Sequence, residues 1–420
     1  VMMNPGGDLE MTKVIRSAIN DLALNVTSQA KRELDEVVEV AFVGNPIMHH
    51  LLLGINPIEL GGAPFALATD ESVRVRARDL NLKLHTNTRC YVLPCIAGHV
   101  GADTAGMILS EAPHHREAMT LLVDIGTNAE IVLGNNQRLL AASSPTGPAF
   151  EGAQISSGQR AAPGAIERVR IDRKTLEPRF QVIGSELWSN DPGFSKDTKG
   201  IGVTGICGSG IIEVIAEMYL AGILSQDGVI NGNLAANSKH IIADGRTFSY
   251  VLSNGQHIIH VTQNDVRAVQ LAKAALYAGI RLLMERMEIE TVDRIRLAGA
   301  FGSHIDVKYA TVLGLIPDCD LKQVSSAGNS AGAGARIALL NYESRQEIEE
   351  VVRQVEKVET AVEAKFQEHF VQAMAFPHKV DSFPNLAKVI ELPAEIDMQN
   401  HASSIQQRKI RRRRTSNKAL

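Results

Sequence analysis

Aromatic residues and cysteines are scarce in this sequence, and each shortage excludes a class of protein. Only 4% of the 420 residues are aromatic, with a single tryptophan, Trp188. The chain therefore offers few platforms on which nucleic-acid bases could stack. No Cys-x-x-Cys pair occurs, which argues against a zinc or iron–sulfur site of that kind. We expect four buried thiols without disulfides, as in a reducing compartment: Cys90, Cys95, Cys207 and Cys319.

Long apolar runs are also missing. No stretch approaches the roughly 18 residues of a membrane span, and no basic segment followed by an apolar one resembles a signal peptide. The formal net charge of −4 gives no general attraction to nucleic acid or to membranes. A cytoplasmic location with neither nucleic acid nor membrane as partner is the expectation.

Glycine and apolar residues, in contrast, are plentiful. The 34 glycines indicate a loop-rich α/β protein, and a hydrophobic content of 45% allows sizeable cores. A length of 420 residues corresponds to about two or three domains or lobes.

The stretch Leu121–Gly134 reads as a strand, an acidic residue, a tight turn and a second strand. Asp124 ends the first strand, and Gly126 and Thr127 form the turn. Backbone N–H groups of such a turn can bind an anion. Because Asp124 would repel a bare phosphate, a nucleotide site here needs a metal ion between them, usually through water. The alternative is an ordinary hairpin in which Asp124 caps the turn.

Two segments carry small residues at helical spacing, Ile96–Ser110 and Ser325–Leu340. Small residues let a helix lie very close to another backbone, and we expect these two helices to pair. Two interpretations are open. The helices are closely packed and nothing more, or the first is a hinge between two lobes with Asp103 turned toward a cleft.

Other loops also have the composition of binding segments. Ser143–Ala165 carries only Glu151 and Arg160 as charges, and we expect an ordered loop that packs on the cleft or meets a partner. Val203–Ile211 opens a helix with a glycine-rich turn, which suits an anion or only tight helix-on-sheet packing. A strand at Arg294–Leu297 runs into the glycine-rich loop Ala298–Asp306, a ligand-facing position in α/β sheets.

The remaining pattern predicts several regular elements. Thr262 and Asp265 form a capping box for a long helix. The other expected elements are a helix at Glu10–Leu24, strands at Val37–Val43 and Ser72–Arg78, a small β-rich insertion at 225–261, the long helix at Val266–Met287, a charged helix from about Ser344 to Val371, and a solvated, disordered basic tail.

The order of these parts resembles the actin-like ATPase superfamily of acetate and sugar kinases, Hsp70 and actin. Within it, the closer match is the ferredoxin-containing family of ATP-dependent reductive activators of corrinoid proteins. The strings that carry this resemblance are VGNPIMHHLLLG (Val43–Gly54), PCIAGHVGAD (Pro94–Asp103), DIGTNAEIVL (Asp124–Leu133), SSPTGPAFEGAQISSGQRAAPGAI (Ser143–Ile166), TGICGSGI (Thr204–Ile211) and RLAGAFGSHID (Arg296–Asp306).

The resemblance implies two RNase H-like lobes around a nucleotide cleft. The implied ranges are the remainder of the N-terminal lobe at 1–118, the C-terminal lobe at 119–345 with its β insertion, a C-terminal helix and extension at 346–394, and the basic tail at 395–420. Family members use ATP hydrolysis to drive an electron uphill from an N-terminal [2Fe–2S] domain onto cob(II)alamin. That electron restores the Co(I) state of a corrinoid methyl-transfer partner.

The resemblance also assigns residues to the site. Asp124 becomes the carboxylate that holds Mg²⁺ through water, and Asp103 orients the attacking water or the metal. Ile96–Ile108 and Ala327–Leu339 become the two connecting helices. The loop with Glu151 and Arg160 becomes the surface that faces the partner. The implied nucleotide-binding residues are Asp124, Gly126, Thr127, Asn128, Gly205, Gly208, Ser209, Gly210, Gly299, Ala300, Phe301, Gly302 and Ser303.

Two departures from the family pattern suggest a fragment that lacks its upstream half. No cysteine set could replace the [2Fe–2S] domain, and no Asp-x-Gly-Thr hairpin occurs before Val38. Three rival functions remain: a small-molecule kinase of the same superfamily, an activator of 2-hydroxyacyl-CoA dehydratases, and a non-enzymatic corrinoid-protein docking module. A homodimer is also left open.

Overall fold

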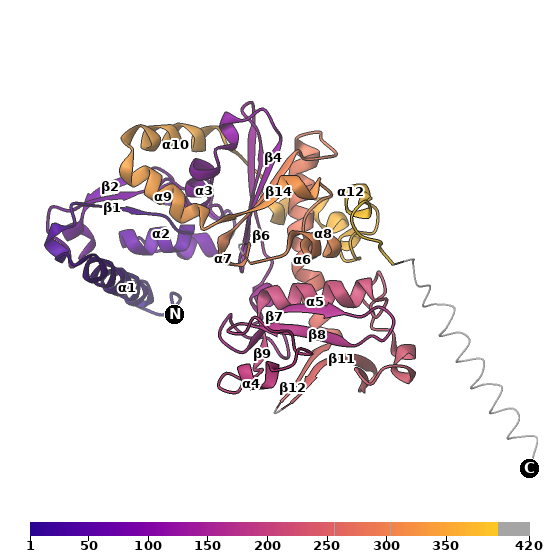
Figure 1. The fold of residues 1–420 in the computed structure, drawn as a ribbon. Helices are drawn as coiled ribbons and strands as arrows, with labels where there is room; N and C mark the ends of the chain where they lie inside the picture. The colour runs from indigo at the N-terminus through magenta and orange to yellow at the C-terminus, as the bar shows by residue number, and fades with distance from the viewer. Residues whose placement is uncertain (256, 303, 394–420) are drawn as a thin grey trace, which may run out of the picture. The chain divides into compact units, whose positions relative to one another are not determined.

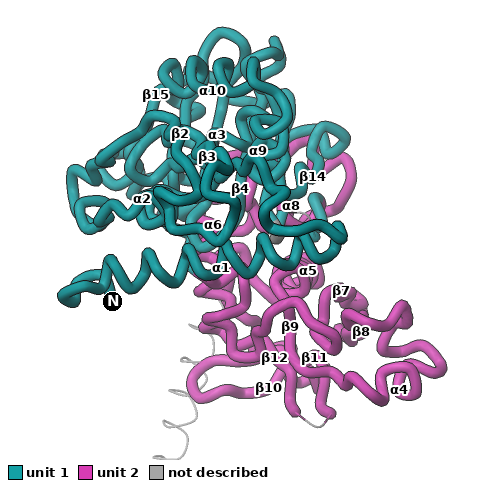
Figure 2. The backbone as a smooth tube through the Cα atoms, turned by 90° about the vertical axis from the view of Figure 1, so that its left-hand side faces the viewer, with its two compact units in different colours: residues 1–147, 275–307, 319–370 teal, residues 148–274, 308–318, 371–420 magenta. Residues whose placement is uncertain are grey.

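The structure is a computed structural model that describes residues 1–255, 257–302 and 304–393. The chain forms two compact units (Figure 2). Unit 1 comprises residues 1–147, 275–307 and 319–370, and unit 2 comprises residues 148–274, 308–318 and 371–420. Both units combine helices with sheets, as the predicted α/β class requires. The basic tail predicted at 395–420 lies outside the described residues.

The first sheet of unit 1 has three strands in the order β1-β3-β2. Parallel to β1 (Glu39–Phe42) runs β3 (Arg89–Val92), and β2 (Val73–Arg76) is antiparallel to β3. Two helices lie beside this sheet, α1 (Gly7–Ala30) and α2 (Pro46–Leu53). Together with β1 they line an apolar groove of about 450 Å³. The expected helix at Glu10–Leu24 and the two expected strands are confirmed, with shifted ends.

The second sheet of unit 1 has six strands in the order β14-β13-β4-β5-β6-β15. The third strand in this order, β4, is parallel to β13 on one side and antiparallel to β5 on the other. The bounds are β4 (Thr120–Ile125), β5 (Ala129–Gly134), β6 (Leu139–Ser144), β13 (Arg294–Ala298), β14 (Val324–Gly328) and β15 (Glu356–Lys357).

Helices cover both faces of the six-stranded sheet. Leu122 and Val132 share a core with α3 (Ala102–Glu111). Ile131, the residue before Val132 on β5, faces the opposite side of the sheet. There a Cβ atom at Gly279 of α6 (Gln263–Arg286) would lie 2.8 Å from the Cδ1 atom of Ile131. Successive side chains of a strand point to opposite faces. The sheet therefore lies between α3 and α6.

The two helices rich in small residues pack against each other, as predicted, but the first begins at Ala102 and not at Ile96, because Ala97 and Val100 pair as an isolated β-bridge. They are α3 and α9 (Ser330–Leu340), which lie side by side in Figure 1. A Cβ atom at Gly334 would overlap the carbonyl oxygen of Gly106, so no side chain fits between the two backbones. The helix predicted over Ser325–Leu340 is wrong at its start, because residues 324–328 form β14 and complete the edge of the sheet.

The single charged helix predicted for Ser344–Val371 is also wrong. α10 (Tyr342–Gln354) ends early, and the next residues form β15, which adds to the edge of the sheet beside β6. A further short helix, α11 (Phe366–Gln372), follows. Val355 and Val358 flank β15 and are both buried, so their apolar side chains favour an extended segment against the core over another helical turn.

Unit 2 contains two three-stranded sheets, β8-β7-β9 and β10-β11-β12. The second is the predicted β insertion. α5 (Gly208–Leu220) lies on β7 so closely that a Cβ atom at Gly210 would overlap the carbonyl oxygen of Ile166. The bounds are β7 (Ala165–Ile171), β8 (Pro178–Val182), β9 (Gly205–Ile206), β10 (Ile241–Asp244), β11 (Thr247–Asn254) and β12 (Ile258–Thr262).

The start of α6 has the predicted capping box. The backbone N–H of Thr262 donates to Asp265 Oδ2 at 2.8 Å, and the N–H of Asp265 donates to Thr262 Oγ1 at 3.2 Å. Further along, the fully buried Lys273 donates to the carbonyl oxygens of Ala375 and Pro377, both at 2.7 Å. The chain that follows α11 is thereby tied to this helix inside unit 2.

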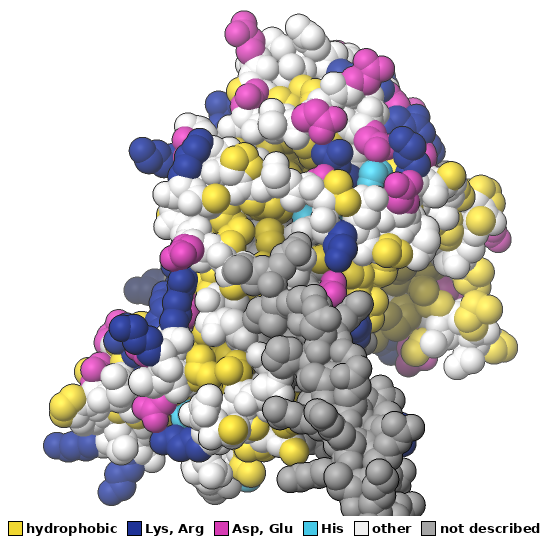
Figure 3. Space-filling view, turned by 90° about the vertical axis from the view of Figure 1, so that its right-hand side faces the viewer, with side chains coloured by type: hydrophobic (Ala, Val, Ile, Leu, Met, Phe, Trp, Pro, Cys, Tyr) yellow, Lys and Arg dark blue, Asp and Glu magenta, His cyan; other side chains and the backbone are white. Residues whose placement is uncertain are grey.

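The four cysteines all lie in the described part of the chain, where they are buried and form no disulfide, as predicted. Burial raises the pKa of Cys90 to about 11 and that of Cys95 to about 12. Among the described helices, none combines the length and the apolar character that crossing a bilayer requires. On the face drawn in Figure 3, basic and acidic side chains are interspersed, so no patch of a single sign forms there.

Candidate nucleotide and metal site

The stretch Leu121–Gly134 is the predicted hairpin, formed by β4 and β5 in unit 1. Asp124 lies directly opposite Glu130, and Ile125 lies opposite Ala129. Directly opposed residues of an antiparallel pair have Cβ atoms about 5 Å apart. The hairpin therefore presents two carboxylates, one from each strand, on the same face.

The turn of this hairpin is held from its carbonyl side. The Thr146 hydroxyl donates to the carbonyl oxygens of Gly126 at 2.8 Å and Thr127 at 3.0 Å, and the N–H of Gly147 donates to Thr127 at 2.8 Å. In a trans peptide the N–H points away from the preceding carbonyl. The N–H groups of Thr127 and Asn128 therefore point away from Thr146, in the arrangement that binds anions.

A third carboxylate, Asp103, lies in the first turn of α3. Its backbone N–H donates to the carbonyl oxygen of Gly44 at 3.3 Å, and its Oδ1 atom accepts from the N–H of Thr104 at 2.8 Å. Leu122 and Val132 pack on α3 from one face of the sheet. Asp124 and Glu130 lie on that same face, each two residues nearer the turn of the hairpin. The three carboxylates thus lie near one another in unit 1, close enough for their charges to interact.

Burial raises the pKa of each carboxyl in this group, and repulsion by neighbouring carboxylates adds to the shift for Asp124 and Glu130. Burial raises the pKa of Asp124 to about 6, and the charge of Asp103 adds to the effect. Burial and then the charges of Asp103 and Asp124 raise the pKa of Glu130 to about 8. For Asp103, burial raises the pKa although the N–H groups around it oppose the shift. Three negative charges held together out of water are costly, and a divalent cation would offset that cost.

The loop predicted at Ala298–Ser303 lies beside Asp124. Ala298 ends β13 as the register partner of Asp124, and Gly299–Gly302 form a short helix, α7. Gly299 has a φ of +82°, and a Cβ atom on it would overlap Asp124 Oδ1. Only glycine allows this approach. Ser303 and the side chains of Ala300 and Phe301 lie outside the described residues, so their predicted role stays a prediction.

The predicted residues of unit 2 have structural neighbours of their own. A Cβ atom at Gly205 would lie 2.6 Å from Gln159 Oε1, and Ser209 is buried beside Cys207. Close packing within unit 2 is thus sufficient to explain why positions 205 and 210 are glycines. The nucleotide-binding interpretation of Gly205, Gly208, Ser209 and Gly210 stays a prediction.

The loop that carries Glu151 and Arg160 is ordered by its own contacts in unit 2. The Ser156 N–H and hydroxyl donate to Asp265 Oδ1 at 2.8 and 3.0 Å, and the N–H of Gln159 donates to the carbonyl oxygen of Ile206 at 2.9 Å. Glu151 and Arg160 are both exposed. Their role toward a partner stays a prediction.

Glu130 is the site residue that the sequence analysis missed. Its signal was present, because Asp124 and Glu130 are equally distant from Thr127 at the centre of the turn. A hairpin centred on that residue places them opposite each other.

The residues present fit a magnesium ion but not an iron–sulfur cluster. Carboxylate oxygens are the ligands that Mg²⁺ prefers in proteins, and Asp103, Asp124 and Glu130 supply carboxylates that can hold a hydrated ion through its water molecules. A cluster needs thiolates, whereas the raised pKa values of Cys90 and Cys95 favour the neutral thiol. No cysteine belongs to any group of metal-ligating side chains in the described part of the chain.

Comparison with known protein families gives two consecutive matches. Residues 1–116 match the RACo middle region, and residues 118–387 match the C-terminal domain of RACo, the ASKHA domain. ASKHA domains are the ATP-binding domains of the acetate and sugar kinase, Hsp70 and actin type. Residues 118–387 thus form a domain of the ASKHA class, which implies that it binds ATP.

Individual proteins agree with the family match. The chain is 32% identical over 380 residues to the corrinoid activation enzyme RamQ of Eubacterium limosum, covering 88% of this chain and 61% of RamQ. It is 28% identical over 341 residues to the [Co(II) methylated amine-specific corrinoid protein] reductase of Methanosarcina barkeri, covering 77% of this chain and 59% of the reductase. A solved structure, the reductive activator for corrinoid,iron-sulfur protein, matches with a TM-score of 0.77 and 33% identity, covering 90% of this chain and 58% of that one.

This chain belongs to the RACo family of corrinoid activation enzymes. It spans about three fifths of the length of the relatives it matches. The resemblance identified from the sequence is confirmed at the level of the family.

Proposed function

We propose that this chain is the ATP-binding and ATP-hydrolysing region of a reductive activator of corrinoid proteins. The observation that carries the proposal is the carboxylate group Asp103, Asp124 and Glu130 beside the anion-binding turn and Gly299. In the complete reaction, one electron from an iron–sulfur domain outside this chain reduces Co(II) of the corrinoid to Co(I). Hydrolysis of ATP to ADP and phosphate supplies the free energy.

The proposed site binds ATP together with Mg²⁺. When bound, the ion offsets the charge of the phosphates. Asp124 holds the ion through water, and the N–H groups of Thr127 and Asn128 donate to phosphate oxygens. Asp103 orients the attacking water or the metal, and Glu130 adds a carboxyl whose protonation depends on the ion. Gly299 and Gly302 leave room for the adenosine.

The finer fold assignment belongs to the same proposal. Residues 1–118 form part of one RNase H-like lobe and residues 119–345 form a second, with the nucleotide between Asp103 on the first and Asp124 on the second. The pairing of α3 with α9 supports this assignment, since the superfamily places two such helices at the junction of its lobes. Residues 346–394 then form the C-terminal extension, and the ordered loop with Glu151 and Arg160 faces the corrinoid partner.

The direct test is Asp124→Ala, with Mg²⁺-ATP binding measured by titration calorimetry. We expect at least about a tenfold weaker affinity, because the variant loses the carboxylate assigned to the metal. The substitution relieves repulsion, so the variant should unfold at a temperature no lower than the unsubstituted chain. Asp21→Ala, an exposed carboxylate on α1, is the matched control and should bind normally. Equal affinity in Asp124→Ala would overturn the proposed site.

A further inference from the structure

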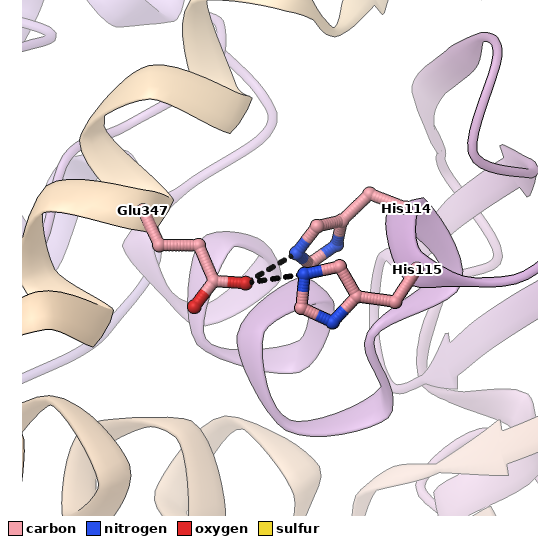
Figure 4. Close-up of side chains that lie close together, drawn as sticks. All are labelled: His114, His115 and Glu347. Atoms are coloured by element: carbon pink, nitrogen blue, oxygen red, sulfur yellow. Dashed lines mark hydrogen bonds and ion pairs between the residues drawn. The ribbon is translucent and has the colours of Figure 1, made fainter.

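A second group of metal-ligating side chains lies apart from the proposed ATP site in unit 1. His114 and His115 end the short turn Pro113–His115 that connects α3 to β4, and Glu347 projects from α10 (Figure 4). Glu347 Oε1 lies 2.8 Å from His114 Nε2 and 2.9 Å from His115 Nε2. The three possible ligand atoms all lie within 4.8 Å of one another. More than 230 residues of sequence separate the two histidines from Glu347.

The three side chains form a partly exposed cluster that an ion can reach. The side chain of His114 is 11% exposed, that of Glu347 is 30% exposed and that of His115 is 63% exposed. The two imidazole rings lie 4.2 Å apart between centroids. Each ring directs its Nε2 atom at the same carboxylate oxygen of Glu347. One divalent cation bound to both Nε2 atoms needs neither ring to be charged.

The Glu347 oxygen is already near the spacing from both Nε2 atoms that a bound ion requires. Zinc lies about 2.0–2.2 Å from nitrogen and carboxylate oxygen, so neighbouring ligand atoms in tetrahedral geometry are about 3.3 Å apart. The two N–O separations of 2.8 and 2.9 Å need to open by only about half an ångström. His114 Nδ1 makes no hydrogen bond to any described residue. The orientation of this ring therefore depends on the partner of its Nε2 atom.

The two elements that carry the cluster, α10 and the turn Pro113–His115, are each held by contacts within unit 1. On the α10 side, Ile348 is fully buried in the core, and Arg345 donates to the carbonyl oxygen of Ala338 at 2.5 Å and to Glu39 at 2.8 Å. On the other side, the N–H of His115 donates to the carbonyl oxygen of Ala112 at 3.2 Å. A metal site requires ligands whose backbones are held in this way.

The local charges favour a cation. On α10, Glu343 and Glu350 lie four residues before and three residues after Glu347, which places them on the same side of the helix. Both are exposed. The positive charge of Arg116, the residue after His115, opposes these carboxylates. Its guanidinium is directed at the carbonyl oxygen of Glu111, which lies 3.5 Å from its Nε atom.

We propose that His114, His115 and Glu347 form a binding site for a divalent transition-metal ion. Two imidazoles and one carboxylate with a water molecule suit zinc, since zinc takes three such ligands and leaves the fourth position open. The ion ties α10 to the turn that leads into β4, the strand that carries Asp124 of the proposed ATP site. Its occupancy stabilises unit 1 and is independent of ATP.

The test uses the full chain, freed of metal with a chelator, and titrates it with Zn²⁺ and with Co²⁺. We expect one equivalent of either ion to bind, with the visible spectrum of low-coordinate Co²⁺ and a higher unfolding temperature. His115→Ala and Glu347→Gln should each weaken Zn²⁺ binding by at least about tenfold. His85→Ala, which removes another exposed histidine, should leave binding unchanged.

Two results would overturn the proposal. One is the absence of stoichiometric Zn²⁺ binding by the unsubstituted chain. The other is binding by His115→Ala and Glu347→Gln that equals that of His85→Ala. Circular dichroism of each metal-free variant shows whether it is folded, and the isosteric Glu347→Gln change keeps the test valid if His115→Ala is not.

Discussion

Gly299 and Asp124 touch so closely that no side chain fits between them. Gly299 adopts a φ of +82°, and a Cβ atom on it would overlap the Oδ1 atom of the carboxylate. Gly299 directly follows β13, and Asp124 lies near the end of the neighbouring parallel strand β4, at the edge of the sheet where ligands of α/β proteins bind. This contact connects the loop assigned to the adenosine with the carboxylate assigned to the metal.

Gly299→Ala should therefore weaken Mg²⁺-ATP binding by about tenfold or more, because the added methyl group displaces either Asp124 or the loop. The overlap and the positive φ together should also cost about 1–3 kcal/mol of stability. Calorimetric titration and urea unfolding measure the two effects. Gly61→Ala is the control, since a Cβ atom there meets nothing within 4 Å. Unchanged affinity in Gly299→Ala would show that this loop does not contact the nucleotide.

Glu130→Gln should change how the stability of the chain depends on pH. Glu130 has a pKa of about 8 in the folded chain against its usual 4.5, so the folded state binds more protons than the unfolded state between these values. Stability contributed by this group is therefore lost as pH rises from about 4.5 to about 8. Relative to Glu130→Gln, the unsubstituted chain should lose stability across that window. Urea unfolding of both proteins at several pH values measures the difference.

Addition of Mg²⁺ supplies the control for this experiment. A bound cation stabilises the ionised carboxylates, so the difference between the two proteins should shrink when the ion is present. Parallel stability curves without Mg²⁺ would show that Glu130 does not carry a raised pKa.

Thr146→Val should loosen the turn that we propose binds phosphate. The variant keeps the shape of the side chain but removes the hydroxyl that donates to Gly126 and Thr127. With those carbonyl groups released, the N–H groups of the turn lose their orientation, and ATP affinity should fall about threefold to tenfold while stability falls by about 1–2 kcal/mol. Calorimetric titration measures the affinity. Thr175→Val, at an exposed turn of unit 2, should leave it unchanged.

Gly334→Ala should destabilise the contact between α3 and α9. The methyl group would overlap the carbonyl oxygen of Gly106, so the helices must separate, at a cost of about 1–3 kcal/mol. The shift also moves Asp103 in the first turn of α3, so ATP affinity should fall as well. Arg336→Ala, at an exposed position of α9, is the control for urea unfolding. A variant as stable as this control would indicate that the two backbones can separate at no cost.

The hairpin and the helix pair could be predicted because each has a local signal. Asp124 precedes a Gly-Thr turn between two apolar runs, and the small residues around Gly106 and Gly334 recur at helical spacing. Each signal depends only on residues a few positions apart, which the chain brings together on its own.

Other features depend on contacts between distant segments. Ser325–Gly328 has small residues without a strong preference, and its place at the edge of the sheet beside β13 makes it a strand. No spacing in the sequence connects His114 and His115 with Glu347, because the fold of unit 1 alone brings α10 to the turn before β4. Glu130 lies between these cases, since its position follows from the register of a hairpin already predicted.

The burial of the four cysteines makes the chain suitable for site-directed labelling. Maleimide reagents attack thiolates that they can reach, and Cys90 and Cys95 are both buried and held as neutral thiols. Cys207 and Cys319 are buried as well. A new cysteine at the exposed Asn128 would react first. A fluorophore attached there would report nucleotide arrival at the turn, without prior removal of the native cysteines.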